Sequence, residues 1–258
     1  MIDVIIVGYP KSGTTWVTRL VAELVGCPVV GFLDDYAHKE IAREGLDRKS
    51  DYQCFKSHHQ LHELRDIKTN TRKIIYVVRD PRDISISGSK YFHFKRWSVL
   101  EYFMSVLPKG KRIHDRLIKR LIMPSSYRIN RMGDAVLYGS KEIHWWIRVS
   151  WITHLKPYME NQYFFVKYED LLNDPEHECK RILTFLGLDR DKRQIKEAIE
   201  KQSFRKKKAE FLKDNESVKA NFMKVGKKEQ WRQVLSKRQK KMFQEMLTDE
   251  LNQFGYRI

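Results

Sequence analysis

Cysteine is scarce in this chain of 258 residues, and its three cysteines are not spaced to build a disulfide framework or a metal site. Cys27, Cys54 and Cys179 lie far apart, and none belongs to a C-x-x-C pair. Small secreted domains depend on dense cysteines, and structural zinc sites use closely paired ones. The sequence therefore predicts neither feature, and we expect a reducing compartment, the cytoplasm.

Long hydrophobic runs, internal repeats and low-complexity tracts are also missing. The first helical pattern, which begins after Thr15, is interrupted by Arg19 and Glu23. A signal peptide or a transmembrane helix needs an unbroken apolar stretch. We therefore expect a chain with no signal peptide and no membrane span.

Acidic residues are outnumbered by basic ones. The chain has 50 Lys and Arg against 33 Asp and Glu, which gives a formal net charge of +17. Such a charge suits nucleic acid, an anionic membrane or an enzyme with polyanionic substrates. Because the basic residues are scattered and no nucleic-acid-binding signature accompanies them, we expect no nucleic-acid partner. The sequence does not indicate an oligomeric state.

Apolar runs alternate with helical patterns, which is typical of an α/β fold. Runs that suit buried parallel strands lie at residues 2–7, 52–56, 73–78 and 163–166. Helices are predicted at residues 16–25, from Asp80-Pro81, at 97–107, 111–122 and 141–159, from Asp174-Pro175 to Gly187, and from Ser236. The stretch 203–230 lacks periodicity and is predicted to be a long basic loop.

These elements predict a single domain over residues 1–258, because a chain of this length suits one α/β domain. Its sheet should be mainly parallel, doubly wound and flanked by helices, in a P-loop-like arrangement. In such folds ligands bind beyond the carboxyl ends of the strands.

Residues 8–16 read Gly-Tyr-Pro-Lys-Ser-Gly-Thr-Thr-Trp and connect the first predicted strand to the first predicted helix. A loop that feeds a helix N-terminus suits a phosphate or sulfate ester, and Lys11 adds a full positive charge. The spacing of Gly8 and Gly13 matches the first half of a Walker loop, but Thr14 stands where that motif has its lysine. This departure argues against a Mg²⁺-dependent NTPase.

Two further polar segments also follow predicted strands. Phe55-Lys56-Ser57-His58 offers a histidine whose ordinary pKa suits general base catalysis, although His59 competes with His58 for the role. Arg79 opens a segment that ends at Ser87, and its guanidinium fork suits a phosphate dianion.

Together these motifs resemble the cytosolic, small-molecule sulfotransferases, which use 3′-phosphoadenosine 5′-phosphosulfate (PAPS). Residues 8–16 resemble the family's 5′-phosphosulfate loop. The Lys56-Ser57-His58 segment resembles its Lys-Thr-His segment, a register that selects His58 as the base. The Arg79 segment resembles the family's 3′-phosphate segment, in which Arg79 and Ser87 would make the contacts.

Later segments resemble the same family in the same order. Tyr168 and Phe204 match residues that contact adenine. The loop that closes over the 3′-phosphate is matched by Phe222, Met223, Lys224 and Gly226. The chain departs from the family at Lys224, which replaces Arg, and at Val225, which replaces Lys. Whether Lys227 or Lys228 replaces the missing contact stays open.

The resemblance implies transfer of a sulfuryl group from PAPS to a hydroxyl or amine of a small acceptor. It assigns Lys11 to the leaving phosphate, Lys56 to the transferred group, His58 to the acceptor proton, and Ser87 to the 3′-phosphate with a restraint on Lys11. The expected cofactor-binding residues of the first loop are Lys11, Ser12, Gly13, Thr14, Thr15 and Trp16, with the threonines on the 5′-phosphate and Trp16 on adenine. No carboxylates stand at metal-ligand spacing, and the resemblance implies a metal-independent reaction.

Two alternatives remain at this point: a P-loop kinase acting on a nucleoside or small molecule, and a basic domain that binds RNA or heparin. The acceptor is also open. We expect its pocket to include Asp34, Asp35, Tyr91 and Phe92, together with a helical insert around residues 97–135. If the two carboxylates face that pocket, the acceptor is cationic, because a buried carboxylate needs a partner charge. A neutral phenol or alcohol is the other possibility.

Overall fold

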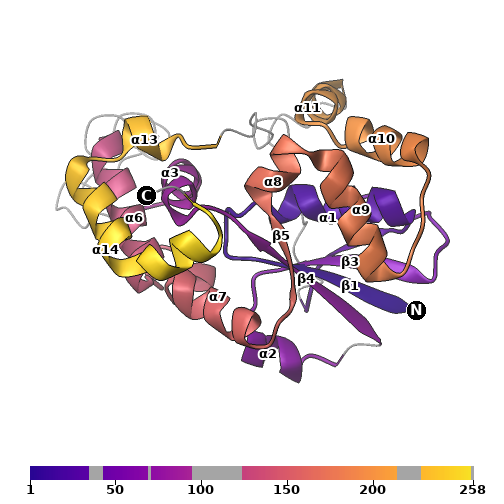
Figure 1. The fold of residues 1–258 in the computed structure, drawn as a ribbon, viewed down its shortest axis with the longest axis horizontal. Coiled ribbons are helices and arrows are strands. Elements are labelled where there is room, and N and C mark those ends of the chain that lie inside the picture. Colours follow the sequence, from indigo (N-terminus) through magenta and orange to yellow (C-terminus); the bar gives the residue numbers. More distant parts are fainter. Residues whose placement is uncertain (35–42, 69–70, 95–123, 214–227, 257–258) are drawn as a thin grey trace, which may run out of the picture. The chain divides into compact units, whose positions relative to one another are not determined.

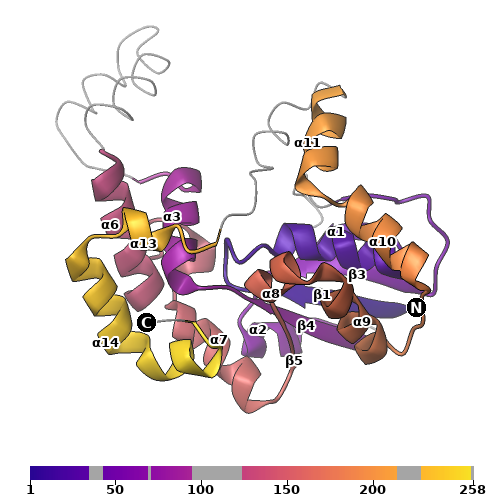
Figure 2. The same ribbon diagram turned by 45° about the horizontal axis from the view of Figure 1, so that its top comes forward.

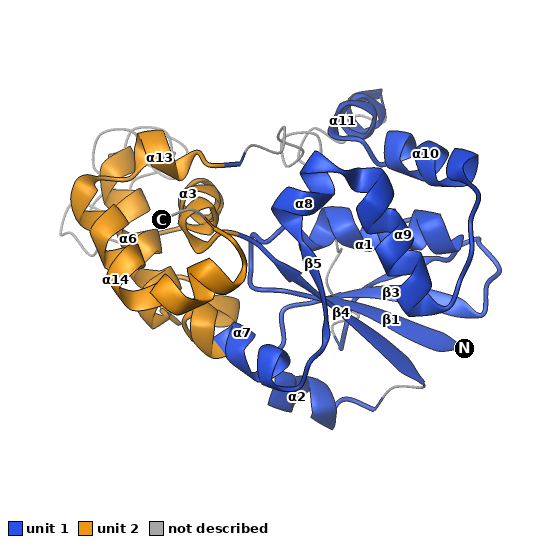
Figure 3. Ribbon diagram, in the orientation of Figure 1, with its two compact units in different colours: residues 1–79, 154–228 blue, residues 80–153, 229–258 orange. Residues whose placement is uncertain are grey.

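The computed structural model describes residues 1–34, 43–68, 71–94, 124–213 and 228–256 (Figure 1). Its contacts divide the chain into two compact units (Figure 3). Unit 1 comprises Met1–Arg79 with His154–Lys228, and unit 2 comprises Asp80–Thr153 with Glu229–Ile258. The prediction of one domain over residues 1–258 stays a prediction.

Unit 1 contains a five-stranded sheet in the order β2-β3-β1-β4-β5. Its strands are β1 (Ile2–Val7), β2 (Val29–Phe32), β3 (Tyr52–Ser57), β4 (Arg72–Val78) and β5 (Phe164–Lys167). Every pairing in this sheet is parallel. Val7 is in register with Ser57 on β3 and with Tyr76 on β4, so these three strands end at the same edge.

Helices cover both faces of this sheet (Figure 1). They are α1 (Thr14–Val25), α2 (Leu61–Asp66), α8 (Tyr168–Asn173), α9 (Pro175–Leu186), α10 (Lys192–Lys201), α11 (Phe204–Lys213) and most of α7 (Trp151–Glu160). Val4 and Ile6 of β1 pack with apolar residues of α1, α9 and α10 in one buried core. Side chains alternate between the faces of a strand, so Tyr76 lies on the other face, where it contacts His154 and Tyr158 of α7.

Unit 2 is helical where it is described. It contains α3 (Pro81–Tyr91), α6 (Ser125–Tyr138), the short 3₁₀ helix η1 (Trp145–Ile147), α13 (Trp231–Val234) and α14 (Lys237–Gln253). Asp80 caps α3 by accepting from the Arg82 amide at 2.9 Å. Asp83 accepts from the Trp231 amide at 3.0 Å and so ties α13 to α3.

The predicted fold class is confirmed, since the sheet is parallel, flanked by helices and follows the predicted strands. The sequence did not predict β2, α2, α8, α10 or α13. The prediction of a loop over 203–230 is wrong for Phe204–Lys213, which form α11. The helix predicted at 141–159 begins only at Trp151, after η1. The helices predicted at 97–107 and 111–122 lie outside the described residues.

No helix in the described part of the chain combines the length and the apolar character that crossing a membrane requires. The cytoplasmic location stays a prediction.

Candidate active site

The loop between β1 and α1 ends in an open helix N-terminus. Gly13 is the N-cap of α1, and no side chain caps the first turn. The Ser12 hydroxyl is fully buried and has no hydrogen-bond partner among the described residues. Backbone N–H groups at a helix start and an unsatisfied buried hydroxyl are donors that an anion can use. The loop therefore has the chemistry of an anion site.

Two side chains from neighbouring strand ends hold this loop in place. Arg79, which follows β4, donates from Nη1 to the carbonyl of Lys11 at 3.0 Å. Lys11 has φ +75°, a conformation that is uncommon for a residue with a side chain, and the Arg79 bond holds its carbonyl there. The Arg79 guanidinium carbon lies 4.5 Å from the centroid of the Tyr168 ring, a cation–π contact.

Tyr168 lies directly against the loop. A Cβ placed on Gly13, whose φ is +94°, would come within 2.5 and 2.7 Å of ring carbons of Tyr168. Only glycine tolerates both this backbone conformation and this approach. The contact fixes α8, which starts at Tyr168, on the first turn of α1.

Aromatic rings continue from Tyr168 along α1. Trp16 meets Tyr168 edge-on with ring centroids 5.7 Å apart. The Phe204 ring lies on Trp16 with centroids 5.1 Å apart and planes tilted by 36°. The Trp16 Nε1–H donates to the carbonyl of Gln202 at 3.0 Å. Trp16 and Phe204 thus form an aromatic wall that a planar base can pack against.

His58 touches the same loop from the end of β3. Its Nδ1 lies 2.6 Å from the carbonyl oxygen of Gly8. A carbonyl oxygen can only accept, so Nδ1 carries the proton and Nε2 holds the lone pair of the neutral ring. Nε2 is therefore the basic atom of His58.

A buried hydrogen-bonded chain holds the backbone of His58. His154 Nε2–H donates to the His58 carbonyl at 3.0 Å, and the Tyr76 hydroxyl donates to His154 Nδ1 at 2.8 Å. The backbone of Tyr9 hydrogen-bonds to the same Tyr76 hydroxyl. This chain links β3, β4 and the anion loop, so the position of His58 depends on all three.

His59, the competing histidine, has different surroundings. Its Nδ1 lies 2.9 Å from the Ser57 hydroxyl, which also accepts from the His59 amide. The Tyr158 hydroxyl donates to the His59 carbonyl at 2.8 Å. His58 of this pair hydrogen-bonds to the anion loop.

Burial lowers the pKa of His58 well below its ordinary value of 6.5. The positive charge of Lys56 also lowers this pKa, and His154 and Lys11 act in the same direction. The bond to the Gly8 carbonyl raises it but does not reverse the shift. His58 is therefore neutral, and able to accept a proton, at neutral pH.

Most of the predicted site residues in unit 1 lie around this loop: Lys11, Ser12, Gly13, Thr14, Thr15, Trp16, Lys56, His58, Arg79, Tyr168 and Phe204. Ser87 and Tyr91 lie in α3 and Phe92 at its end, all in unit 2, so their roles stay predictions. Five predicted residues lie outside the described part of the chain: Asp35, Phe222, Met223, Lys224 and Gly226. Lys228 is described, and its Nζ hydrogen-bonds to Asn173.

The sequence analysis missed His154, Tyr76 and Gln202. No sequence pattern links a single histidine in a helix, a tyrosine in a strand or a backbone carbonyl to a functional site. In the part of the chain that the structure describes, no group of three His, Cys, Asp or Glu side chains is placed to hold a metal ion.

The sequence of this chain is similar to those of known sulfotransferases. A family model described as "Sulfotransferase domain" matches residues 1–255. Human sulfotransferase 1C2 is 23% identical over 270 residues, which cover 95% of this chain and 81% of the relative. Bovine sulfotransferase 1A1 is 25% identical over 269 residues, with 94% of this chain and 81% of the relative covered.

Solved structures share the fold. Mouse sulfotransferase SULT7A1 complexed with PAP aligns with a TM-score of 0.65 at 21% identity, over 97% of this chain and 84% of that one. Retinol dehydratase in complex with androsterone and the inactive cofactor PAP aligns with a TM-score of 0.63 at 19% identity, over 99% and 82%.

The close approach of Gly13 to Tyr168 predicts how far a methyl group at position 13 would lower the stability of the fold. Gly13→Ala and Gly26→Ala both place alanine at positive φ, which costs about 1–2 kcal/mol. A Cβ at Gly26 meets nothing within 4 Å. A Cβ at Gly13 displaces the Tyr168 ring, and this overpacking lowers the free energy of unfolding by about a further 1–3 kcal/mol. Thermal unfolding should therefore show a clearly lower Tm for Gly13→Ala than for Gly26→Ala. Equal losses would contradict the packing described.

The environment of His58 predicts its titration. Its pKa, measured by NMR of the ring protons, should lie below 6.5. Lys56→Met should raise this pKa, because it removes a positive charge that disfavours the imidazolium form. Lys208→Met is a matched control, since the Lys208 charge is not among those that shift His58. A pKa at or above 6.5 in the unmodified chain, or one that Lys56→Met leaves unchanged, would show that the described environment is wrong.

Proposed function

Because this chain belongs to the sulfotransferase domain family, we propose that it transfers the sulfuryl group of PAPS to a hydroxyl or amine of a small acceptor. The observation that carries the proposal is the uncapped start of α1 beside the buried, unpartnered Ser12 hydroxyl. These donors fit the phosphosulfate end of PAPS. The mouse sulfotransferase of similar fold was crystallised with PAP, the bisphosphate that remains after sulfuryl transfer, which supports the same donor.

The residues present also suit the rest of this donor. The N–H groups of the loop, with Thr14 and Thr15, would hold the 5′-phosphate, and Trp16 with Phe204 and Tyr168 would hold the adenine. Arg79 would bind the 3′-phosphate with Ser87. When bound, PAPS supplies the sulfuryl group and a phosphate leaving group.

His58 is proposed as the general base. Its Nε2 would take the proton of the acceptor hydroxyl, and its lowered pKa keeps that atom unprotonated at neutral pH. Lys56 and Lys11 lie close enough to act on the pKa of His58. Their charges are proposed to stabilise the transferred group and the leaving phosphate, respectively.

Family membership favours this activity over the two alternatives. A kinase would need the lysine and hydroxyl pair of the Walker loop, which Thr14 and Thr15 do not provide. A domain that only binds RNA or heparin gives no reason for a buried base to contact the anion loop.

The acceptor is proposed to be cationic because of an acidic cavity in unit 1. The cavity has a volume of about 910 Å³. Its lining includes Asp34 and three other carboxylates against one lysine: Asp3, Glu63, Asp66 and Lys68. His59, the neighbour of His58, lines it as well. In a chain of net charge +17 this local excess of negative charge favours the binding of an acceptor that carries an amine or guanidinium group.

Nucleotide selectivity tests the proposed donor. PAP should bind at least about tenfold more tightly than ADP, because a charge-assisted contact to the 3′-phosphate contributes roughly 1.5–3 kcal/mol. Arg79→Met should remove most of this preference, whereas Arg205→Met, at an exposed position on α11, should leave it intact. Isothermal titration calorimetry measures all of these affinities. Equal affinity of the unmodified chain for PAP and ADP would refute the proposal.

Substitution of Asp34 tests the acceptor class. Asp34→Asn should raise the KM for a cationic acceptor by about tenfold and leave the KM for a neutral phenol unchanged, because only the cation loses a charge partner. Asp189→Asn makes the same change at an exposed site and should affect neither KM. If Asp34→Asn left discrimination between the two acceptors unchanged, a cationic acceptor would be ruled out.

A further inference from the structure

One carboxylate in unit 1 accepts hydrogen bonds from a helix and a turn that come much later in the sequence. Glu44 Oε1 accepts from Gln202 Nε2 at 2.8 Å and from Lys207 Nζ at 3.0 Å. Its Oε2 lies 3.5 Å from Nε of Arg19, on α1. The backbone of Glu44 pairs with Val29 of β2, whose amide donates to the Glu44 carbonyl at 2.9 Å. The carboxylate is therefore fixed to the sheet.

The cations that meet Glu44 are buried. The side chains of Lys207 and Arg19 are each only 2% exposed. A buried cation is costly unless a counter-charge accompanies it. Glu210 also pairs with Lys207, but that carboxylate is half exposed, so its attraction is more strongly screened by water. Glu44 is therefore the principal counter-charge that keeps Lys207 inside.

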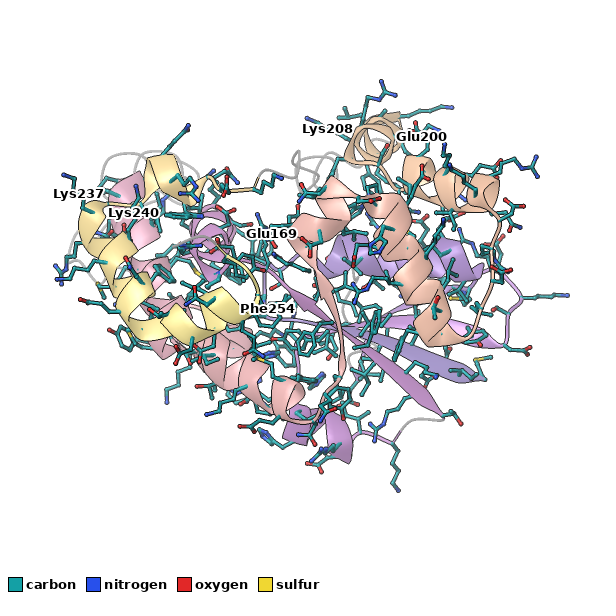
Figure 4. The ribbon with its side chains drawn as sticks, viewed as in Figure 1. Glu169, Glu200, Lys208, Lys237, Lys240 and Phe254 are labelled. Atoms are coloured by element: carbon teal, nitrogen blue, oxygen red, sulfur yellow. The ribbon has the colours of Figure 1, made fainter. Side chains whose placement is uncertain are left out.

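Lys207 stands out within a basic run that would otherwise be solvated. Its neighbours Arg205, Lys206 and Lys208 are exposed, and Lys208 lies on the outer side of α11 (Figure 4). The inward Lys207 docks this helix on unit 1 together with the buried Phe211, whose ring centroid lies 5.0 Å from the Arg19 guanidinium carbon, although the stretch lacks clear apolar periodicity. α10 packs on α1, and α11 follows it directly (Figure 2).

The partners of Glu44 are connected to the aromatic wall formed by Trp16 and Phe204. Phe204 precedes Lys207 by three residues, which places the two side chains on one face of α11. Phe204 lies on Trp16, and Gln202 accepts the Trp16 indole N–H. One contact of Trp16 therefore comes from Gln202, which is itself a partner of Glu44, and the other comes from Phe204, on the same face of α11 as the partner Lys207.

We infer that Glu44 is a positioning residue for the nucleobase. Through Lys207 and Gln202 it docks α11 and the turn before it, and so holds Phe204 against Trp16 where adenine would pack. Glu44 itself touches neither the anion loop nor the reacting atoms. This inference rests on the proposed function, because it assumes that the nucleotide carries a base.

The test compares two ligands that differ only in the base. Glu44→Gln should weaken the binding of PAP by about tenfold, since stacking of one base on aromatic side chains contributes roughly 1–3 kcal/mol. It should leave the binding of ribose 3,5-bisphosphate, which has no base, unchanged. With PAPS as donor, KM should rise while kcat at saturation stays the same, and Glu44→Asp should restore part of the affinity. Equal losses for both ligands, or no loss for PAP, would overturn the inference.

A double mutant separates positioning from general destabilisation. In a Phe204→Ala background, Glu44→Gln should cause no further loss of PAP affinity, because the ring that it positions is gone; additive losses would contradict the inference. Should Glu44→Gln fail to fold, Lys207→Met takes its place, with its exposed neighbour Lys208→Met as the control that should bind PAP normally.

A measurement without nucleotide keeps this inference distinct from the proposed function. Hydrogen exchange of the α11 amides should become faster in Glu44→Gln and not in Lys208→Met. If α11 exchanged no faster in Glu44→Gln, the docking role would be refuted even if PAP bound. If the unmodified chain bound no PAP while α11 responded as expected, the proposed function would fail, and with it the assignment to a nucleobase, although the docking of α11 by Glu44 would stand.

Discussion

The parallel register of β1 with its two neighbours determines where this chain can carry out chemistry. Val7 is level with Ser57 on one side and with Tyr76 on the other, so the chain leaves all three strands at one edge of the sheet. The anion loop, His58 and Arg79 follow these three strand ends. His58 and Arg79 then each donate a hydrogen bond to the backbone of the loop: His58 to the Gly8 carbonyl and Arg79 to the Lys11 carbonyl.

The basic side chains of this chain have specific effects where they are buried or lie close to a titratable group. The formal charge of +17 says little by itself, since most of the basic residues that the structure describes are exposed. Close to the loop, the charge of Lys56 helps keep His58 neutral, which a general base requires. Further along α1, buried Arg19 and Lys207 share the carboxylate of Glu44 and join α1 to α11. The same kind of side chain therefore lowers the pKa of a histidine at one place and fixes a helix at another.

Local patterns predicted the parts of the fold that local forces decide. The strands predicted at 2–7 and 73–78 are continuous apolar runs, and the motifs that follow them lie together because parallel strands end at one edge. β2 was missed because it has four residues and a shift of register between Val29 and Gly31. α11 was missed because its inward side chains meet distant partners: Lys207 meets Glu44, 163 residues away in the sequence, and Phe211 meets Arg19. Likewise, the bond from His154 to His58 spans 96 residues and leaves no local pattern. The roles of Ser87, Tyr91 and Phe92 depend on how α3 meets the donor and acceptor, which no local pattern decides.

The central claim is that a histidine bound to the anion loop serves as the base for sulfuryl transfer. The most direct measurement is transfer of label from ³⁵S-PAPS to a mixture of small acceptors in the presence of EDTA, with the affinity for PAP measured in parallel. The account predicts transfer by the unmodified chain and by His59→Ala. For His58→Ala it predicts a rate lower by about 10² to 10⁴ with nearly unchanged PAP affinity. A large loss in His59→Ala with normal transfer by His58→Ala would contradict it.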